Sequence, residues 1–488
     1  MVFLNRVDGE ARLTFDDVLL LPARSRVLPS EVSLKSAFCK GVVLNLPVAS
    51  AAMDTVTESD MAIAMALQGG IGVVHKNVSA EQQAAEVRRV KRKINFIVEN
   101  PATVTPGTTL AELKAAGDGD ASSFPVLDGG KLVGIVTSRD VRFEKNPAAR
   151  VADLMTRDVV FETVASLKEF SPGKAVELLH KHRIERLPLV DRQGKLLGLV
   201  TYRDLTVSSK YPQASRDAGG RLVVAAAISP FDGARAAALV EAGVDVLVLD
   251  TAHGNSQGVI DAAGRFAGEF GVPIVAGNVC TADGCRNLID AGVAGVKVGV
   301  GAGSICTTRI ISGCGAPQLS AVLECAEACR EAGVPLIADG GIRYSGDAAK
   351  ALAAGASCVM LGNMLAGTDE SPGRVVMMGG RKYKTYRGMG SLGAMALGGR
   401  ERYFQGGVAS SKLVPEGIEG VVPFKGSVEE VLYQLAGGVK SGMGYCGCAS
   451  LEEFWKAKFI RISPAGHAES HPHDVVVTQE APNYRAPQ

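Results

Sequence analysis

The sequence has almost no net charge, because 52 lysines and arginines are balanced by 51 aspartates and glutamates, which leaves +1 at neutral pH. A protein that binds nucleic acid or an anionic membrane through its surface charge carries a clear excess of basic residues. We therefore expect neither kind of partner, and any ligand has to be argued from a local site.

Long hydrophobic runs are also lacking. An apolar stretch such as residues 222–228 is far shorter than the ~18 residues that a transmembrane helix requires. Residues 1–6 do not contain the apolar core of a signal peptide. We expect a cytoplasmic protein without a membrane segment.

The ten cysteines show none of the paired spacings that are typical of zinc sites. Cys446 and Cys448 are too close together for a CxxC clamp, and His471 and His473 flank a proline at a spacing that suits a single metal poorly. Reduced thiols in a reducing compartment are the simplest interpretation.

What the sequence does contain is a repeated rhythm of a short apolar strand, a polar or glycine tip and an alanine-rich helix. The predicted strands are residues 46–53, 71–75, 222–229, 244–251, 273–279, 295–300, 335–340 and 358–362. Residues 233–243 and 347–355 typify the helices, and both end in Ala-Gly, as helix C-termini commonly do. Strands that are apolar on both faces indicate a parallel sheet covered by helices. Eight of them in alternation predict an α/β protein with a (β/α)8 TIM barrel, with a doubly wound open sheet as the alternative.

An internal repeat interrupts this rhythm. Residues 124–128 and 132–140 are echoed by residues 187–191 and 196–204, down to a shared Thr-x-Arg-Asp ending. The segment resembles a tandem of CBS (cystathionine-β-synthase-type) domains. We therefore predict a discontinuous catalytic barrel over residues 1–94 and 218–488, with an inserted tandem CBS-domain module that consists of one domain over 95–153 and a second over 154–217.

The CBS resemblance implies ATP or GTP as a further partner, because such domains often bind adenine or guanine nucleotides. Thr137, Asp140, Thr201 and Asp204 would then contact ribose and phosphate. The alternative is that these residues only cap the helix that follows each strand.

The strongest local signal is the loop Gly299-Val-Gly-Ala-Gly-Ser-Ile-Cys-Thr-Thr-Arg309. Its glycines free the backbone and allow close approach to a ligand. The loop also presents Cys306 at the end of a strand, where amides and nearby cations favour the nucleophilic thiolate. Barrel enzymes hold their active sites at the carboxyl ends of the strands. We therefore expect polar residues that end a strand, such as Asp250 and Asp339, to lie in the same site as Cys306. Together these groups indicate a nucleoside monophosphate that is attacked on its base.

Several further motifs match one family. The Cys306 loop and residues 339–341, 386–390, 402–405 and 412–419 resemble those of bacterial-type inosine 5′-monophosphate (IMP) dehydrogenases, and the resemblance extends from residues 13–20 to 482–485. It implies IMP as the substrate, NAD as the cofactor and a potassium ion as the metal. It also implies a homotetramer, with an octamer through the CBS domains as the larger alternative.

The same resemblance implies roles for individual residues. Cys306 would add to C2 of the hypoxanthine ring, and Arg402 on a mobile flap would activate the water that hydrolyses the resulting thioimidate to xanthosine 5′-monophosphate (XMP). An arginine base is unexpected, because a guanidinium ordinarily stays protonated. The catalytic set is Cys306, Arg402, Tyr403 and Thr308. The substrate-binding set is Ser304, Asp339, Gly340, Gly341, Gly362, Asn363, Tyr386, Arg387, Gly388, Met389, Gly390 and Glu416. The cofactor-binding set is Asp250, Gly299, Val300 and Gly301. The potassium set is Gly301, Gly303 and Cys306, with Glu469, Ser470 and His471 supplied by a neighbouring subunit.

Three positions depart from the family pattern: Ala302 replaces a common proline, Asn363 a common serine and Val421 a common arginine. None of them removes a reacting group. A GMP reductase, which releases ammonia with NADPH, shares the barrel and the cysteine loop but needs no flap arginine, so Arg402 favours the dehydrogenase. A catalytically silent nucleotide sensor on the same fold is a third interpretation, and the intact Cys306 and Glu416 argue against it.

Overall fold

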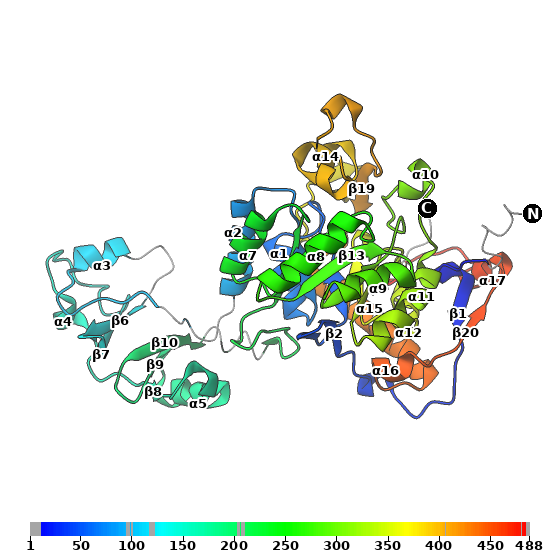
Figure 1. The fold of residues 1–488 in the computed structure, drawn as a ribbon. Coiled ribbons are helices and arrows are strands. Elements are labelled where there is room, and N and C mark those ends of the chain that lie inside the picture. The colour runs from blue at the N-terminus through cyan, green and yellow to red at the C-terminus, as the bar shows by residue number, and fades with distance from the viewer. Residues whose placement is uncertain are drawn as a thin grey trace, which may run out of the picture. The chain divides into compact units, whose positions relative to one another are not determined.

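The structure is a computed structural model that describes residues 11–93, 98, 101–116, 123–202, 205, 210–405, 407–479 and 481–484. Contacts divide the chain into two compact units (Figure 1). The larger consists of Met1–Lys93, Gln213–Asp217 and Leu222–Gln488, and the smaller of Ile94–Pro212 and Ala218–Arg221. Almost all of the segment that we expected to be inserted, residues 95–217, therefore belongs to the smaller unit.

The larger unit is built on a closed barrel of eight parallel strands. They are β4 (Val48–Ser50), β5 (Ile71–Val74), β11 (Val224–Ile228), β12 (Val246–Asp250), β13 (Ile274–Val279), β14 (Gly295–Val298), β15 (Leu336–Asp339) and β16 (Cys358–Leu361). Each overlaps one predicted segment, so the predicted (β/α)8 barrel is confirmed. The open-sheet alternative is wrong, because β16 pairs with β4 and β5 pairs with β11 to close the ring.

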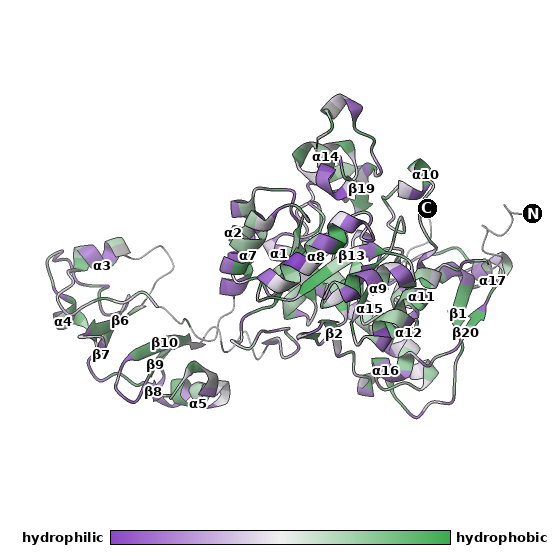
Figure 2. Cartoon of the chain, viewed as in Figure 1, coloured by the Kyte–Doolittle hydropathy of each residue, from purple (hydrophilic) through white to green (hydrophobic). Residues whose placement is uncertain are grey.

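The barrel strands are buried along their whole length except for Asp339 at the end of β15. Figure 2 shows the resulting concentration of apolar residues, for example along β13. Helices α1 (Ser59–Leu67), α2 (Ala80–Lys93), α7 (Gly233–Glu241), α8 (Gln257–Glu269), α9 (Ala282–Asp290), α11 (Gln318–Glu331) and α12 (Ser345–Ala353) alternate with these strands. The predicted Ala-Gly ends are confirmed: Gly243 and Gly355, just after α7 and α12, have φ of +87° and +108°, which favour glycine.

The smaller unit contains two antiparallel strand pairs that correspond to the two copies of the repeat. One is β6 (Ser123–Asp128) with β7 (Lys131–Thr137), and the other is β9 (Arg186–Val190) with β10 (Leu196–Thr201). The second sheet also includes β8 (Glu162–Thr163). The helices that the structure describes in this unit are α3 (Leu110–Ala116), α4 (Val151–Leu154), η4 (Leu167–Glu169) and α5 (Pro172–His182). Asp204, one of the predicted nucleotide contacts, lies outside the described residues.

A second sheet of the larger unit, made of β17 (Val375–Met378), β18 (Arg381–Arg387) and β19 (Glu419–Pro423), is antiparallel. The segment between β18 and β19, residues 388–418, is called the flap below. It carries α14 (Leu392–Leu397), η5 (Gly399–Tyr403) and η6 (Ser410–Lys412), and it is the gold segment around α14 in Figure 1. The flap contributes side chains to the site described below.

The remaining elements complete the larger unit. They are η2 (Phe15–Asp17), β1 (Val18–Leu20), η3 (Pro29–Glu31), β2 (Ser36–Cys39), β3 (Val42–Leu44), α10 (Thr308–Ile311), α13 (Asn363–Ala366), α15 (Val428–Cys446), α16 (Leu451–Phe454), β20 (Phe459–Arg461) and α17 (Pro464–Glu469). Strand β1 pairs with β20, and β2 pairs with β3. Among the helices that the structure describes, none combines the length and the hydropathy needed to cross a bilayer.

Candidate active site

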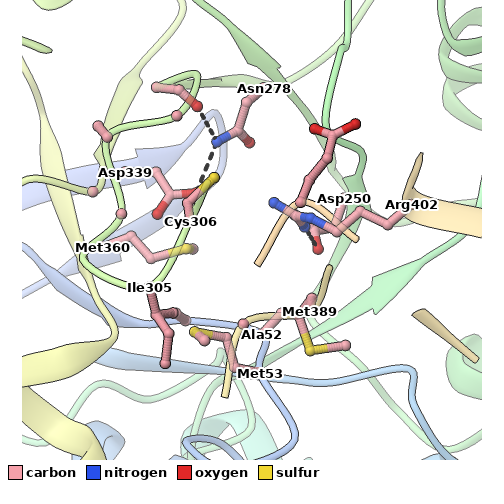
Figure 3. A pocket seen from close by; sticks show the side chains of 18 of the residues that line it. Ala52, Met53, Asp250, Asn278, Ile305, Cys306, Asp339, Met360, Met389 and Arg402 are labelled. Atoms are coloured by element: carbon pink, nitrogen blue, oxygen red, sulfur yellow. Dashed lines mark hydrogen bonds and ion pairs between the residues drawn. The ribbon is translucent and has the colours of Figure 1, made fainter. Parts of the chain in front are cut away.

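A pocket lies at the carboxyl ends of the barrel strands, where barrel enzymes hold their active sites (Figure 3). Strand ends, the cysteine loop and the flap all contribute to its wall. The predicted residues that line it are Asp250, Gly299, Gly301, Gly303, Cys306, Asp339, Gly340, Tyr386, Gly388, Met389, Arg402, Tyr403 and Glu416. Three of the four predicted catalytic residues and many of the substrate and cofactor residues thus line one cavity, whereas Thr308, Ser304, Gly362, Arg387 and Gly390 do not line it.

The glycines of the cysteine loop are required by backbone conformation and by close packing. Gly299 and Gly301 have φ of +147° and +71°. A Cβ on Gly299 would clash with the carbonyl oxygen of Asp339, and one on Gly301 would meet the side chain of Arg309. Any other residue at these positions would push the loop away from β15, and Cys306 would move with it.

Cys306 lies in a loop that is paired with the segment carrying Glu416. The Thr307 amide donates to the Glu416 carbonyl at 2.9 Å, and the Ile418 amide donates to the Ile305 carbonyl at 3.1 Å. The Cys306 Sγ lies 3.1 Å from the hydroxyl of Thr308, the first residue of α10. This short antiparallel pairing brings the Cys306 thiol and the Glu416 carboxylate into one cavity from distant parts of the sequence.

The other cysteines do not share this setting. Burial raises the pKa of Cys39 to about 12, and it also raises the pKa of Cys358 and Cys446. These thiols stay protonated at neutral pH, and none of them lines the pocket. Cys306 is the cysteine that the pocket contains.

A lysine that is absent from the predicted sets lies at the centre of the pocket floor. Lys297 on β14 is only 1% exposed, and its Nζ lies 3.0 Å from Asp250 Oδ1 and 2.7 Å from Asp339 Oδ2. It also contacts the side-chain oxygen of Asn278, whose amide nitrogen donates to Asp339 at 2.9 Å. A buried charge must be paired. The lysine inside the apolar strand Gly-Val-Lys-Val was therefore the sequence signal from which this ion-pair cluster could have been predicted. Lys297 holds together the carboxylates predicted for the two riboses.

We expect Lys297→Met to destabilise the protein by about 3–5 kcal/mol, because it leaves the buried carboxylate of Asp250 and the partly buried one of Asp339 without the cation between them. Urea unfolding followed by circular dichroism measures the change. Lys93→Met, at an exposed lysine at the end of α2, is the matched control and should leave the midpoint unchanged. Equal midpoints for the two variants would show that Lys297 does not have this role.

The flap places Arg402 inside the pocket. The guanidinium of Arg402 forms an ion pair with Oδ2 of Asp250, and the Ala252 amide donates to the Arg402 carbonyl at 3.0 Å. The adjacent Tyr403 ring packs against Gly390, and burial raises its pKa. Asp250 therefore has one cation on each carboxylate oxygen, Lys297 from the barrel and Arg402 from the flap, and the flap is closed over the site.

Three of the residues predicted on the phosphate side also meet. Tyr386 is buried, which raises its pKa to about 12, and the nearby Ser304 hydroxyl partly opposes this shift. A Cβ on Gly362 would lie 3.1 Å from the Tyr386 hydroxyl. The neighbouring Arg387 forms an ion pair with Asp54 at 2.7 Å, which fixes the base of the flap to the end of β4.

Other predicted residues lie outside the pocket wall. Val300 and Gly341 belong to its supporting loops, and Asn363 lines a neighbouring cavity with Arg343 and Lys425. Glu469, Ser470 and His471 lie at the end of α17, where the His471 ring packs 6.0 Å from that of Tyr484. Within the described part of the chain, no group of three or more His, Cys, Asp or Glu side chains is arranged to hold a metal ion. The potassium site stays a prediction.

Comparison with known proteins gives consistent results. The family profile described as "IMP dehydrogenase / GMP reductase domain" matches residues 12–473. The inosine-5′-monophosphate dehydrogenase of Haemophilus influenzae is 50% identical and covers 98% of this chain and 99% of its own. That of Methanocaldococcus jannaschii is 48% identical and covers 99% of both. A solved GMP reductase from Trypanosoma brucei, a cysteine-to-alanine variant in complex with guanosine 5′-monophosphate, has a TM-score of 0.85 at 42% identity and covers 97% of this chain and 100% of its own.

Proposed function

This chain belongs to the IMP dehydrogenase / GMP reductase family, and from that membership and the site we propose that it is an NAD-dependent IMP dehydrogenase that oxidises IMP to XMP for guanine nucleotide synthesis. Relatives at about 50% identity over nearly the full chain carry the dehydrogenase name. The observation that carries the proposal is the position of Arg402, which projects from the flap into the cavity that contains Cys306.

In the first half of the proposed reaction Cys306 is the nucleophile. Its thiolate forms a bond to C2 of the hypoxanthine, and the hydride on C2 departs with its electron pair, so that the base is oxidised to a thioimidate on Cys306. NAD+, when bound, supplies the hydride acceptor. Asp250 suits its ribose because a carboxylate accepts hydrogen bonds from two neighbouring hydroxyls, and Gly299, Val300 and Gly301 would line the dinucleotide.

The remaining pocket residues would hold IMP. Asp339 offers a carboxylate to the ribose, and Ser304, Gly362 and Tyr386 form the group on the phosphate side. Glu416, which the backbone pairing holds beside the cysteine loop, would face N1 of the base. These contacts orient C2 toward Cys306 without using the thiol itself.

In the second half water adds to C2 of the thioimidate, the carbon–sulfur bond breaks, and XMP leaves with the water oxygen while Cys306 regains its thiolate. Arg402, with Tyr403 beside it, would orient this water. To accept the proton of the water, the Arg402 guanidinium must first lose one of its own, because the charged form that pairs with Asp250 has no acceptor. The Arg402 guanidinium pairs with the Asp250 carboxylate when the flap is closed. The same carboxylate would therefore bind the cofactor ribose only when the flap is open. Hydride transfer therefore uses the open flap and hydrolysis uses the closed one.

A direct assay separates the three interpretations. IMP-dependent reduction of NAD+ supports the dehydrogenase, whereas GMP-dependent oxidation of NADPH with ammonia release supports the reductase. The similarity to a solved GMP reductase makes this comparison necessary. Absence of both activities in folded protein would favour the silent nucleotide sensor.

The resemblance also supports two proposals about assembly and metal. Carbonyl oxygens of Gly301, Gly303 and Cys306 suit a large monovalent cation better than they suit zinc. The sets Gly301, Gly303, Cys306 and Glu469, Ser470, His471 would form the potassium site from two subunits of a homotetramer. An octamer through the smaller unit is the larger alternative.

The smaller unit would bind ATP or GTP. It contains a pocket lined by Thr137, Asp140, Arg139 and Arg183, among others, so that two arginines could meet phosphate. The Asp140 carboxylate also accepts hydrogen bonds from the Thr137 amide and hydroxyl at 2.7 and 2.8 Å. The alternative is that Asp140 caps a helix after the strand, but residues 138–143 form a turn; Asp140 caps this turn, so nucleotide binding and turn capping need a test.

We expect nucleotide to stabilise the full-length protein by about 2.7 kcal/mol at a hundredfold excess over Kd, and Asp140→Ala to abolish the thermal shift while leaving turnover unchanged. A deletion that joins Lys93 to Gln213 should stay active without the shift. It keeps Asp217 because Lys91 Nζ binds that carboxylate at 2.9 Å. An undiminished shift in Asp140→Ala would mean that the aspartate only caps its turn. Loss of turnover in a folded deletion would refute separable regulation.

A further inference from the structure

Lys76, which follows β5, is a buried lysine that the proposed mechanism does not use. It is 8% exposed, and its Nζ has no hydrogen-bond partner among the described residues. The nearest carboxylate oxygen, Oε2 of Glu401 on η5 of the flap, is 3.9 Å away. An ammonium group in this state has lost its hydration without gaining hydrogen bonds in exchange.

The flap is the element that lies over this end of β5. Next to Lys76, the side-chain amide of Asn77 donates to the Ala394 carbonyl of the flap at 3.2 Å. A Cβ on Gly398, also in the flap, would lie 2.9 Å from Asn77 Oδ1. Opening the flap would therefore uncover Lys76 and return its ammonium to water.

The charged groups that act on Lys76 come from two elements. Glu401 and Arg402 belong to η5, and Asp232 and Arg235 lie at the start of α7. Glu401 attracts the ammonium, while Arg402 repels it as the flap closes. Burial, the largest cause, lowers the pKa of Lys76 to about 8, and Glu401 partly opposes this shift.

We propose that Lys76 is a positioning residue that opposes closure of the flap, and that Glu401 offsets this opposition, so the pair sets the balance between the open and closed flap. The inference rests on the proposed function, in which both flap states are needed in each turnover. A flap that closed too firmly would keep Asp250 occupied by Arg402, and one that closed too weakly would leave the thioimidate without its water-activating group.

The two residues should therefore have opposite effects. Lys76→Met removes the buried ammonium but keeps the apolar stem, so it should favour the closed flap. Glu401 is half-exposed, and water can solvate it once its partner is gone. Glu401→Gln leaves the ammonium without its nearest carboxylate and should favour the open flap. In the double variant of Lys76→Met and Glu401→Gln, the second substitution should have little further effect, because the ammonium that Glu401 attracts is absent.

The pH dependence has a defined sign. A lysine whose pKa is lower in the closed state binds its proton more weakly there, so protonation favours opening. Because the pKa of Lys76 falls from its ordinary value of 10.5 to about 8 on closure, the closed fraction of the unsubstituted protein should rise as the pH is raised from about 8 to about 10.5. Lys76→Met should be more closed than the unsubstituted protein at pH 7, this difference should shrink as the pH rises toward about 10.5, and the flap of the variant should not respond to pH.

Hydrogen exchange at the amides of residues 399–403, in the IMP-bound protein with the smaller unit present, measures closure without relying on turnover. Comparing variants at the same pH cancels the intrinsic pH dependence of exchange. We expect slower exchange in Lys76→Met than in the unsubstituted protein at pH 7, by a factor on the order of 10², because the pKa of Lys76 falls from 10.5 to about 8 on closure and each pKa unit is a tenfold change in the equilibrium. Lys93→Met is the control and should not differ from the unsubstituted protein.

Faster or unchanged exchange in Lys76→Met, or a pH response that survives the substitution, would overturn the inference. So would Glu401→Gln with unchanged exchange at pH 7. A NADH burst with IMP and NAD+, measured in parallel, tests the proposed function separately. If no NADH forms but the exchange follows the expected pattern, the dehydrogenase assignment fails while the role of Lys76 in flap closure stands.

Discussion

Cys306→Ala is expected to lower turnover by a factor on the order of 10⁴ or more, because no other group in the pocket can form the covalent bond to C2. IMP binding should be retained within a fewfold. The contacts proposed for phosphate and ribose come from Ser304, Tyr386 and Asp339, and the loop conformation depends on its glycines rather than on the thiol. Turnover is measured as NADH formation, and IMP binding by calorimetry.

Mass spectrometry of the unsubstituted protein during turnover provides the covalent evidence. The purine adduct should be found on the peptide that contains Cys306. Cys314→Ala is the matched control, since this thiol is exposed and follows the same loop, and it should leave both the rate and the adduct unchanged. An adduct on any other cysteine, or appreciable turnover in Cys306→Ala, would refute the nucleophile assignment.

The barrel was predictable from sequence because its signals are local. Each strand is a short apolar run, and the chain returns through helices of which several end in Ala-Gly, as at Gly243 and Gly355. Such patterns depend on neighbours in the sequence, so eight strands could be placed without knowledge of their pairing. The position of Cys306 at the barrel mouth followed from the same rule, since parallel strands bring their carboxyl ends together.

The parts of the site that were missed depend on contacts between distant residues. Lys297 is a single charge within an apolar strand, and its partners Asp250 and Asp339 come from other strands of the barrel. The pairing of the Glu416 segment with the cysteine loop and the ion pair of Arg402 with Asp250 also join distant segments. A family resemblance supplied the residues in these pairs, but the sequence alone carries no signal for which residues touch.

The Arg402–Asp250 ion pair leads to the second large prediction. Arg402→Ala should slow hydrolysis by roughly 10²–10⁴-fold, the range typical of a lost general base, and should leave hydride transfer nearly unchanged. Arg402 acts after NADH has formed, because its closed position occupies the carboxylate proposed for the cofactor ribose. The expected time course is a full NADH burst followed by slow steady-state turnover, with the thioimidate accumulating on Cys306.

Stopped-flow absorbance resolves the burst from the steady state, and acid quench followed by mass spectrometry counts the trapped adduct. Arg381→Ala, which removes an exposed arginine from β18, is the control and should show neither effect. Removing Arg402 also frees Asp250, so NAD+ should bind no more weakly than before. If the burst falls in proportion to the steady-state rate, Arg402 acts before or during hydride transfer, and the ordered use of Asp250 by cofactor and flap is refuted.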